Sequence, residues 1–308
     1  MELLYFLESI RNPVLDAIVS LITHLGGETL FIVIALIFYW CIDKKKGYYI
    51  LAVGFMGTVL NQFLKLMFRI PRPWVKDPNF KIVEAARAEA TGYSFPSGHT
   101  QNAAGYLGCI ARITKKKLLR ISLIILIILV GFSRMYLGVH TPLDVVVSWV
   151  LASLLVMLLY PVFQKADDPK FLYKLLTVML AISAVYTAFV ELHTWPSDID
   201  PNNLASGIKN GWTLTGCSAA MLLACIIDTK KINFETKAPI LGQIIKIAAG
   251  LAIVLVLKSV LKAPLDALFN GAGFARAFRY FIMVMFAAVV WPLCFPFIVK
   301  LTTRKGSR

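Results

Sequence analysis

The chain has 308 residues, of which 58% are hydrophobic and only 16% are charged. A water-soluble domain carries about 25% charged residues, so this composition, with a mean hydropathy of +0.72, excludes that class and indicates a membrane protein. The net charge of +15 would suggest nucleic acid binding in a soluble protein. In a membrane protein, basic residues instead hold loops on the cytoplasmic side, and we expect no nucleic acid partner.

Apolar stretches long enough to cross a membrane recur along the whole chain. A spanning helix needs roughly 20 mostly apolar residues, and stretches of this kind cover 27–42, 47–68, 118–132, 142–163, 171–191, 239–258 and 279–299. Weaker candidates cover 12–25, 99–114 and 212–227. The stretch 99–114 is polar and rich in small residues, so we expect other helices, not lipid, to surround it. The sequence therefore predicts an all-α polytopic membrane protein with about ten spans.

The charged segment 164–170 (QKADDPK) is the best internal boundary. It predicts a six-span core in residues 1–165, followed in residues 166–308 by about four additional spans of unknown role. Basic clusters follow the second, fourth, sixth and eighth predicted spans, and the positive-inside rule makes their side of the membrane cytoplasmic. The basic loop after the third span, 69–87, falls on the outer side and needs another explanation.

The first polar segment near a span is Lys65, followed seven residues later by Arg72 and Pro73. Lys65 lies near the outer end of the third span, and the prolines after it end the helix. The pattern predicts cations at a helix end near the membrane surface. Taken alone, it is also the pattern of a lysine whose stem lies in the apolar region while its charge reaches water.

The second segment is residues 94–100, SFPSGHT. Pro96 and Gly98 favour a turn, and Ser97 is a plausible N-cap for the next helix. A helix start presents free backbone N–H groups to an anion, and His99 would lie beside that anion. The simpler interpretation of the segment alone is a capped helix with an interfacial histidine.

The third segment holds Ser133, Arg134, His140 and Asp144. His140 and Asp144 are four residues apart and share a face of a helix. A carboxylate there can accept the Nδ1 proton of the imidazole and leave Nε2 free as a nucleophile. Alone, the pair could be purely structural. Together, the three segments bring cations, helix starts and two of the four histidines to one membrane face, which is typical of a phosphate site.

These segments resemble the three motifs of the type 2 phosphatidic acid phosphatases, KxxxxxxRP, PSGH and SRxxxxxHxxxD. The family includes lipid pyrophosphatases and is related to the vanadium haloperoxidases. Here the motifs read Lys65–Pro73, Pro96–His99 and Ser133–Asp144, with every fixed position and internal spacing present. The resemblance covers about residues 27–163. It implies a helical membrane bundle whose motifs meet at the ends of three helices.

The resemblance also implies roles for individual residues. His140 would be the nucleophile that forms a phosphohistidine, Asp144 would orient it, and His99 would be the general acid. The phosphate oxygens would be held by Lys65, Arg72, Ser97, Gly98 and Arg134. Arg72 would then serve this site, which accounts for part of the positive charge in the outer loop. The stretch Lys81–Ala90 is a candidate lid.

No metal or cofactor is expected. Phosphoryl transfer requires mainly positioning and charge neutralisation, which three cations and helix-start amides can supply. No carboxylate cluster suited to magnesium accompanies the motifs. The five cysteines form no CxxC pair, which argues against a zinc site.

The sequence thus predicts an integral membrane phosphatase that hydrolyses a lipid phosphomonoester or pyrophosphate, with its site on the outer face of a bacterial plasma membrane. Candidate substrates are undecaprenyl pyrophosphate, phosphatidylglycerol phosphate, phosphatidic acid and sphingoid-base phosphates. Two alternatives remain: a lipid phosphotransferase with the same site, and a non-catalytic lipid-phosphate transporter or flippase. The oligomeric state is not predicted.

Overall fold

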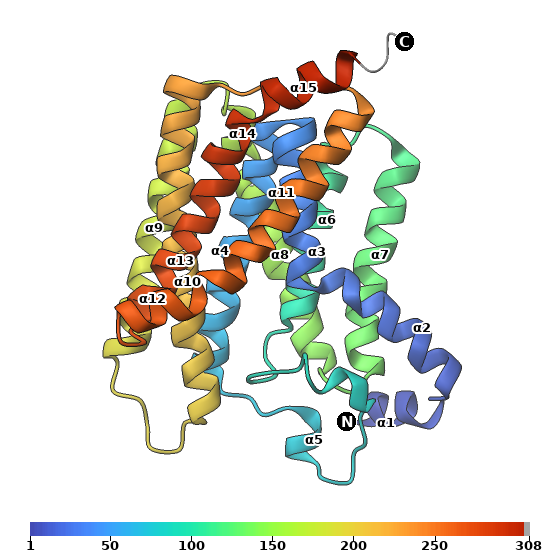
Figure 1. The fold of residues 1–308 in the computed structure, drawn as a ribbon. Coiled ribbons are helices and arrows are strands. Elements are labelled where there is room, and N and C mark those ends of the chain that lie inside the picture. The colour runs from blue at the N-terminus through green and yellow to red at the C-terminus, as the bar shows by residue number, and fades with distance from the viewer. Residues whose placement is uncertain (305–308) are drawn as a thin grey trace. The chain divides into compact units, whose positions relative to one another are not determined.

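The computed structural model describes residues 1–304, and over this range the chain forms helices and no strand (Figure 1). The predicted all-α class is confirmed. The α-helices are α1 (Glu2–Ser9), α2 (Pro13–Thr23), α3 (Glu28–Ile37), α4 (Lys44–Phe68), α5 (Pro73–Lys76), α6 (Gly98–Ile113), α7 (Lys117–Tyr136), α8 (Pro142–Gln164), α9 (Pro169–Leu192), α10 (Pro201–Ile227), α11 (Ile240–Val260), α12 (Lys262–Leu268), α13 (Gly273–Met285), α14 (Trp291–Leu293) and α15 (Phe295–Arg304).

Within the described residues, seven helical segments are long and apolar enough to cross a membrane. They cover Lys44–Lys76, Lys117–Tyr136, Pro142–Gln164, Pro169–Leu192, Pro201–Ile232, Ile240–Leu268 and Gly273–Leu293. The count rises to eight if the helical stretches Pro13–Gly26 and Glu28–Ile42, which are bent by 51° to each other, form one span. The four spans expected after residue 165 are all present.

Before residue 165 the structure has fewer spans than the six expected. The stretches 12–25 and 27–42 form the bent pair and not two separate spans. Helix α6 has only 16 residues. At a rise of about 1.5 Å per residue it is shorter than the roughly 30 Å hydrocarbon core of a bilayer.

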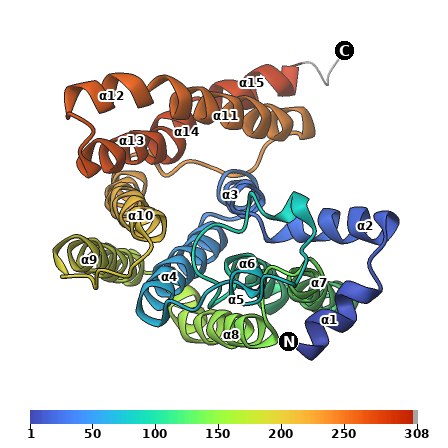
Figure 2. The same ribbon diagram turned by 90° about the horizontal axis from the view of Figure 1, so that it is seen from below.

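Helix α6 is covered by protein, as its composition predicted. The side chain of Ser97 caps its first turn by accepting a hydrogen bond from the Thr100 N–H, and most residues of the helix are buried. Gly26, in the short helix η1 (His24–Gly26), lies so close that an added Cβ would be 2.6 Å from the His99 carbonyl oxygen. Figure 2 shows α6 between α4, α7 and α8. The polar N-terminus of α6 is therefore held within a protein environment.

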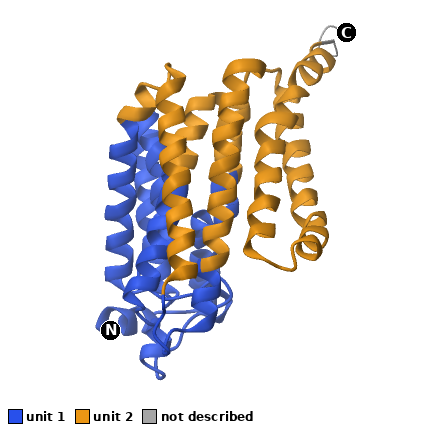
Figure 3. Cartoon of the chain, turned by 90° about the vertical axis from the view of Figure 1, so that its left-hand side faces the viewer, with its two compact units in different colours: residues 1–32, 53–160, 194–207 blue, residues 33–52, 161–193, 208–308 orange. Residues whose placement is uncertain are grey.

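The chain divides into two compact units (Figure 3). Unit 1 comprises residues 1–32, 53–160 and 194–207, and unit 2 comprises residues 33–52, 161–193 and 208 onward. All three motifs lie in unit 1. The predicted boundary between residues 1–165 and 166–308 remains a prediction.

Unit 2 contains two cations, one half-buried and one buried, that find partners within the unit. The Lys44 ammonium lies 2.7 Å from a carboxylate oxygen of Asp228, which is itself buried. Lys246 is fully buried, donates to the Thr236 carbonyl oxygen at 3.0 Å, and lies 4.3 Å from the centre of the Phe295 ring. A buried charge is costly unless it is paired, so these contacts explain how the unit tolerates charges among apolar helices.

Candidate active site

The three motifs meet around one cavity of about 340 Å³ in unit 1. Six of the eight predicted site residues line it: Lys65, Arg72, Gly98, His99, Arg134 and His140. The other two, Ser97 and Asp144, lie behind these residues and are buried. The cavity is formed by the end of α4, the start of α6 and the turn between α7 and α8.

The turn between α7 and α8 places the third motif. Helix α7 ends at Tyr136, and Gly138 adopts a left-handed conformation with φ of +81°. The backbone N–H groups of Val139 and His140 both donate to the Arg134 carbonyl oxygen, at 3.1 and 3.2 Å. Helix α8 begins two residues after His140, at Pro142, so Asp144 follows within its first turn. The chain therefore turns sharply, which brings His140 to the cavity and Asp144 next to His140.

His140 and Asp144 form the buried pair that their spacing predicted. The Nδ1 atom of His140 lies 3.3 Å from Oδ2 of Asp144, and their side chains are 2% and 1% exposed. The same oxygen accepts hydrogen bonds from the Ser94 hydroxyl at 2.5 Å and from the Thr141 N–H at 2.8 Å. These donors fix the carboxylate in place, and the carboxylate in turn orients the imidazole.

Arg72 determines which imidazole nitrogen carries the proton. One of its terminal nitrogens lies 2.9 Å from Nε2 of His140. A guanidinium can only donate hydrogen bonds, so Nε2 accepts, and the proton is on Nδ1 facing Asp144. Burial lowers the pKa of His140 well below its usual value, and the positive charges of Arg72 and Lys65 lower it further. The imidazole is therefore neutral, with its Nε2 lone pair directed at Arg72 on the cavity wall.

Arg72 and Lys65 are anchored by backbone carbonyls of the loop before α6. Arg72 donates to the carbonyl oxygens of Thr91 and Gly92, at 2.7 and 2.9 Å. The Lys65 ammonium donates to the Tyr93 carbonyl and, at 3.4 Å, to that of Ser94. Both cations are thus rigidly held, and the loop that they bind carries the Ser94 hydroxyl to Asp144.

Arg134 lines the cavity and has donors that no other group in the described chain uses. Its side chain is completely buried, and one terminal nitrogen donates to the Thr23 hydroxyl at 2.7 Å. Its Nε and second terminal nitrogen have no hydrogen-bond partner among residues 1–304. A buried unsatisfied donor costs about 1–3 kcal/mol, more when it is charged, so these atoms favour binding of an anion.

The sequence analysis missed two residues near the second motif: Glu89, which contacts His99, and His24, which contacts Glu89. Oε2 of Glu89 lies 3.0 Å from Nε2 of His99, and Oε1 of the same carboxylate lies 3.6 Å from Nδ1 of His24. Glu89 is the last acidic residue before Asp144 in the sequence, and its place nine residues before the PSGH histidine's neighbour Gly98 was the only available signal. His24 follows α2 and carried no signal of its own.

Ser97 and Gly98 are placed differently from each other. Gly98 lines the cavity at the first residue of α6. The Ser97 hydroxyl instead accepts from the Thr100 hydroxyl at 2.9 Å, and the Ser97 N–H donates to the Asp144 carbonyl oxygen at 3.2 Å. Its position is that of a helix cap that also ties α6 to α8.

The candidate lid stretch Lys81–Ala90 folds into only one short 3₁₀ helix, η3 (Glu84–Ala86). Ala86 and Ala90 are buried in an apolar cluster with residues of α1, α2 and the α7–α8 turn. The stretch is thus anchored beside the cavity, and Glu89 is the residue that it extends toward His99. Its role as a lid remains a prediction.

No group of three or more His, Cys, Asp or Glu side chains within residues 1–304 is arranged to hold a metal ion. The prediction of a metal-independent reaction is not tested by this arrangement and remains a prediction. The cavity offers cations and histidines to an anion.

Comparisons with known proteins agree with the motif pattern. Residues 45–168 match the model of the PAP2 superfamily, and residues 212–304 match that of the "PAP2 superfamily phosphatase, transmembrane extension". No solved structure matches the chain.

Three curated relatives illustrate the range of the similarity. Undecaprenyl-diphosphatase BcrC of Bacillus subtilis is 30% identical over 152 residues, covering 49% of this chain and 76% of the relative. Phosphatidylglycerophosphatase B of the same organism is 32% identical, covering 48% and 75%. A probable sphingosine-1-phosphate phosphatase of Dictyostelium discoideum is 27% identical, covering 63% and 51%. With the three motifs gathered at one cavity, these matches show that the chain belongs to the PAP2 superfamily and is an integral membrane phosphatase.

Proposed function

We propose that the protein hydrolyses the phosphate ester or pyrophosphate of a lipid through a phosphohistidine on His140. The observation that carries the proposal is the Nε2 atom of His140, which holds its lone pair toward a cavity lined by Lys65, Arg72 and Arg134. A neutral, oriented nucleophile next to three cations is the arrangement that phosphoryl transfer needs.

In the first step, Nε2 of His140 attacks phosphorus, and the bond from phosphorus to the leaving oxygen breaks. Asp144 accepts a hydrogen bond from Nδ1–H and stabilises the positive charge that develops on the ring. His99 donates a proton to the leaving oxygen. An arriving phosphate oxygen would take over the Arg72 hydrogen bond that now occupies Nε2, which frees the nucleophile.

In the second step, water attacks the phosphorus of the phosphohistidine, and the bond from phosphorus to Nε2 breaks. His99, now neutral, accepts the proton from the attacking water. Lys65, Arg72, Arg134 and the Gly98 N–H hold the phosphate oxygens in both steps. These groups supply the charge neutralisation that a metal ion supplies in other phosphoryl-transfer enzymes, so we propose that the reaction is metal-independent.

The substrate class follows from the relatives. Their names assign undecaprenyl diphosphate, phosphatidylglycerophosphate and sphingosine 1-phosphate to different family members. These molecules share a phosphate or diphosphate on a long apolar tail, and we propose a lipid of this kind as the substrate.

We also propose that the site faces the outer side of a bacterial plasma membrane. Helix α6 begins at the cavity and ends next to the basic cluster 115–117, while α7 begins at that cluster and returns to the cavity. The cluster and the cavity thus lie at opposite ends of these helices. The positive-inside rule assigns the cluster to the cytoplasm, which supports an outward cavity.

The test is phosphate release by the purified protein from a panel of lipid monophosphates and diphosphates, with His140→Ala as the control. We expect release with at least one lipid, retention in EDTA, and loss in His140→Ala. Turnover by His140→Ala would contradict the nucleophile, and loss in EDTA with recovery in magnesium would contradict the metal-free reaction. Phosphate release that requires an added lipid acceptor would indicate a phosphotransferase.

A further inference from the structure

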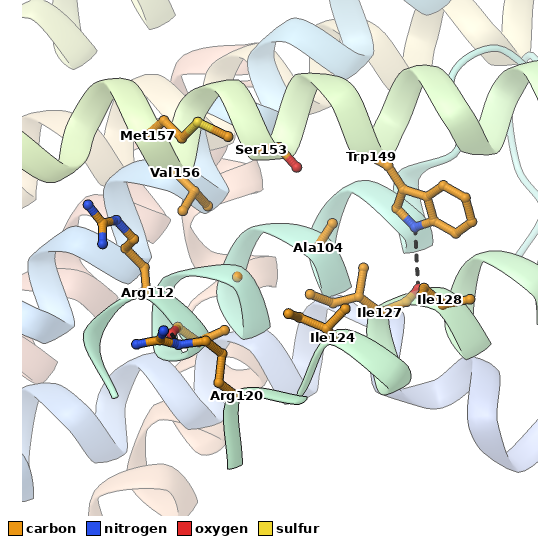
Figure 4. A pocket seen from close by; sticks show the side chains of 12 residues that line it. Ala104, Arg112, Arg120, Ile124, Ile127, Ile128, Trp149, Ser153, Val156 and Met157 are labelled. Atoms are coloured by element: carbon orange, nitrogen blue, oxygen red, sulfur yellow. Dashed lines mark hydrogen bonds between the residues drawn. The ribbon is translucent and has the colours of Figure 1, made fainter. Parts of the chain in front are cut away.

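A second cavity lies in unit 1 at the other end of the same helices. It has a volume of about 390 Å³ and is lined by residues of α6, α7 and α8 (Figure 4). It shares no lining residue with the phosphate cavity. Small residues of α6, Ala104, Gly108 and Ala111, leave the space open, and isoleucines of α7 and apolar residues of α8 form its walls. The cavity is therefore largely apolar and separate from the active site.

One end of this cavity carries two arginines. Figure 4 shows Arg112 and Arg120 at one end and Trp149 at the other. Arg120 is held by the carbonyl oxygens of Ala111 and Thr114, at 3.1 and 2.8 Å. The Arg112 guanidinium lies 4.1 Å from the centre of the Tyr160 ring. These contacts position both guanidinium groups without neutralising their charge.

The positive charge at this end is uncompensated. No carboxylate in the described part of the chain forms an ion pair with Arg112 or Arg120. The sequence has no acidic residue between Glu89 and Asp144, whereas Lys115, Lys116 and Lys117 add three further cations between the arginines. An apolar cavity that ends in cations is complementary to a lipid with an anionic head group.

We propose that this cavity binds an anionic phospholipid, with its phosphate between Arg112 and Arg120 and an acyl chain along α6, α7 and α8 toward Trp149. The apolar lining favours a lipid over a soluble anion, because a free phosphate ion would gain nothing from it. A basic cluster that served only to fix the orientation of the helices in the membrane would need no such cavity beside it. The 16 residues of α6 correspond to about 24 Å of helix, so this lipid belongs to the leaflet opposite the active site.

Trp149 offers a local reporter for the bound chain. It lines the cavity, and its indole N–H donates to the Ile127 carbonyl oxygen at 3.3 Å. The protein is placed in phosphatidylcholine vesicles that contain a low, fixed fraction of lipid brominated on one acyl chain, either phosphatidylglycerol or phosphatidylcholine. Bromine quenches tryptophan fluorescence on contact, and subtraction of the Trp149→Phe signal isolates the contribution of Trp149. Both lipids are phosphodiesters, and only phosphatidylglycerol carries a net negative charge on its head group.

We expect brominated phosphatidylglycerol to quench Trp149 more strongly than brominated phosphatidylcholine. Each cation near an anionic lipid contributes roughly fivefold to affinity, so Arg112→Gln with Arg120→Gln should weaken the preference up to about 25-fold. The matched control is Lys230→Gln with Lys231→Gln, which removes two exposed cations from another basic cluster. Equal quenching by both lipids, or an equal loss in the control, would overturn the proposal.

A second variant keeps the test decisive if the arginine variant folds poorly. Ser153 is exposed and lines the cavity, so Ser153→Phe should fill the apolar part without changing charge. We expect it to abolish quenching of Trp149 while phosphate release from the lipid panel shows that the protein is folded. Undiminished quenching in folded Ser153→Phe, or displacement of the lipid by inorganic phosphate alone, would contradict a lipid site.

Discussion

The guanidinium of Arg72 donates a hydrogen bond to Nε2 of His140 across 2.9 Å, while the Nδ1 side of the same ring faces Asp144. The cation that is expected to bind phosphate therefore also fixes the protonation of the proposed nucleophile. It does so from a position locked by three backbone carbonyls, those of Thr91, Gly92 and Val139.

Replacing Arg72 with lysine should lower kcat by about 100-fold or more, because one ammonium cannot reproduce the planar set of donors. The measurement is phosphate release by the purified variant. The matched control is Arg69→Lys, in which the side chain forms only a surface ion pair with Asp198, so the activity of this variant should stay near that of the wild type. An Arg72→Lys enzyme within about twofold of wild type would show that a point charge suffices, against the donor geometry argued here.

Asp144→Asn should reduce kcat on the order of 10³–10⁴-fold, because an amide cannot stabilise the charged imidazole as a carboxylate does. Ser94→Ala removes one of the donors to the same Asp144 oxygen and should cost only about 10- to 100-fold, since a hydrogen bond to a charged group contributes about 1.5–3 kcal/mol. Both are read from single-turnover phosphate release. If the serine variant were as inactive as the asparagine variant, Ser94 would itself take part in the chemistry.

The sequence identified the motif residues that meet at the phosphate cavity, but it did not identify the residues of other segments that contact them. His140 and Asp144 could be placed because their spacing within one helical turn fixes a shared face, and the structure brings them together. Glu89 and His24 could not be placed, because Glu89 contacts both His99 and His24 only after segments distant in sequence have folded together. The spacing of residues along one helix cannot predict a contact between two separate segments.

The span count was predicted less well for a related reason. Hydropathy marks apolar stretches, but it does not show where a helix bends. The turn at residues 24–27 joins two stretches that were counted separately. Helix α6 was recognised as protein-covered from its small and polar residues, yet its length was decided by the caps at its ends.

His99 should take up a proton when phosphate binds. Burial, followed by the charges of Arg134 and Arg72, lowers the pKa of His99 to about 3, so the imidazole is neutral in the empty site at pH 7. A bound phosphate brings negative charge beside it and favours the protonated form. Calorimetric titration with inorganic phosphate at pH 7, in buffers of different ionisation enthalpy, should therefore show net proton uptake.

The matched variant for this proton is His99→Asn, which should bind phosphate with less uptake. Uptake that is unchanged in His99→Asn would assign the proton to another group and weaken the case for His99 as the acid.

Glu89→Gln tests the neighbouring carboxylate. Because a carboxylate stabilises a protonated histidine, its loss should move the basic limb of the rate profile to lower pH.

Gly138→Ala should destabilise the fold more than Gly271→Ala, although both glycines have a left-handed conformation, with φ of +81° and +70°. An added Cβ at Gly138 would lie 2.9 Å from the Phe80 ring and from an Arg11 nitrogen, whereas at Gly271 it meets nothing within 4 Å. The backbone strain, about 1–2 kcal/mol, is common to both variants. The difference between their thermal midpoints in detergent therefore reports the cost of the close contacts that the added Cβ makes at Gly138.

The same pair of variants separates stability from catalysis. Gly138 lies in the turn that positions His140, two residues away, so Gly138→Ala should also lower phosphate release below the melting range. Gly271→Ala should leave phosphate release unchanged. Equal midpoints and equal rates for the two variants would mean that the turn accommodates the added methyl group. The close packing around Gly138 would then not be what holds His140 in line with Asp144.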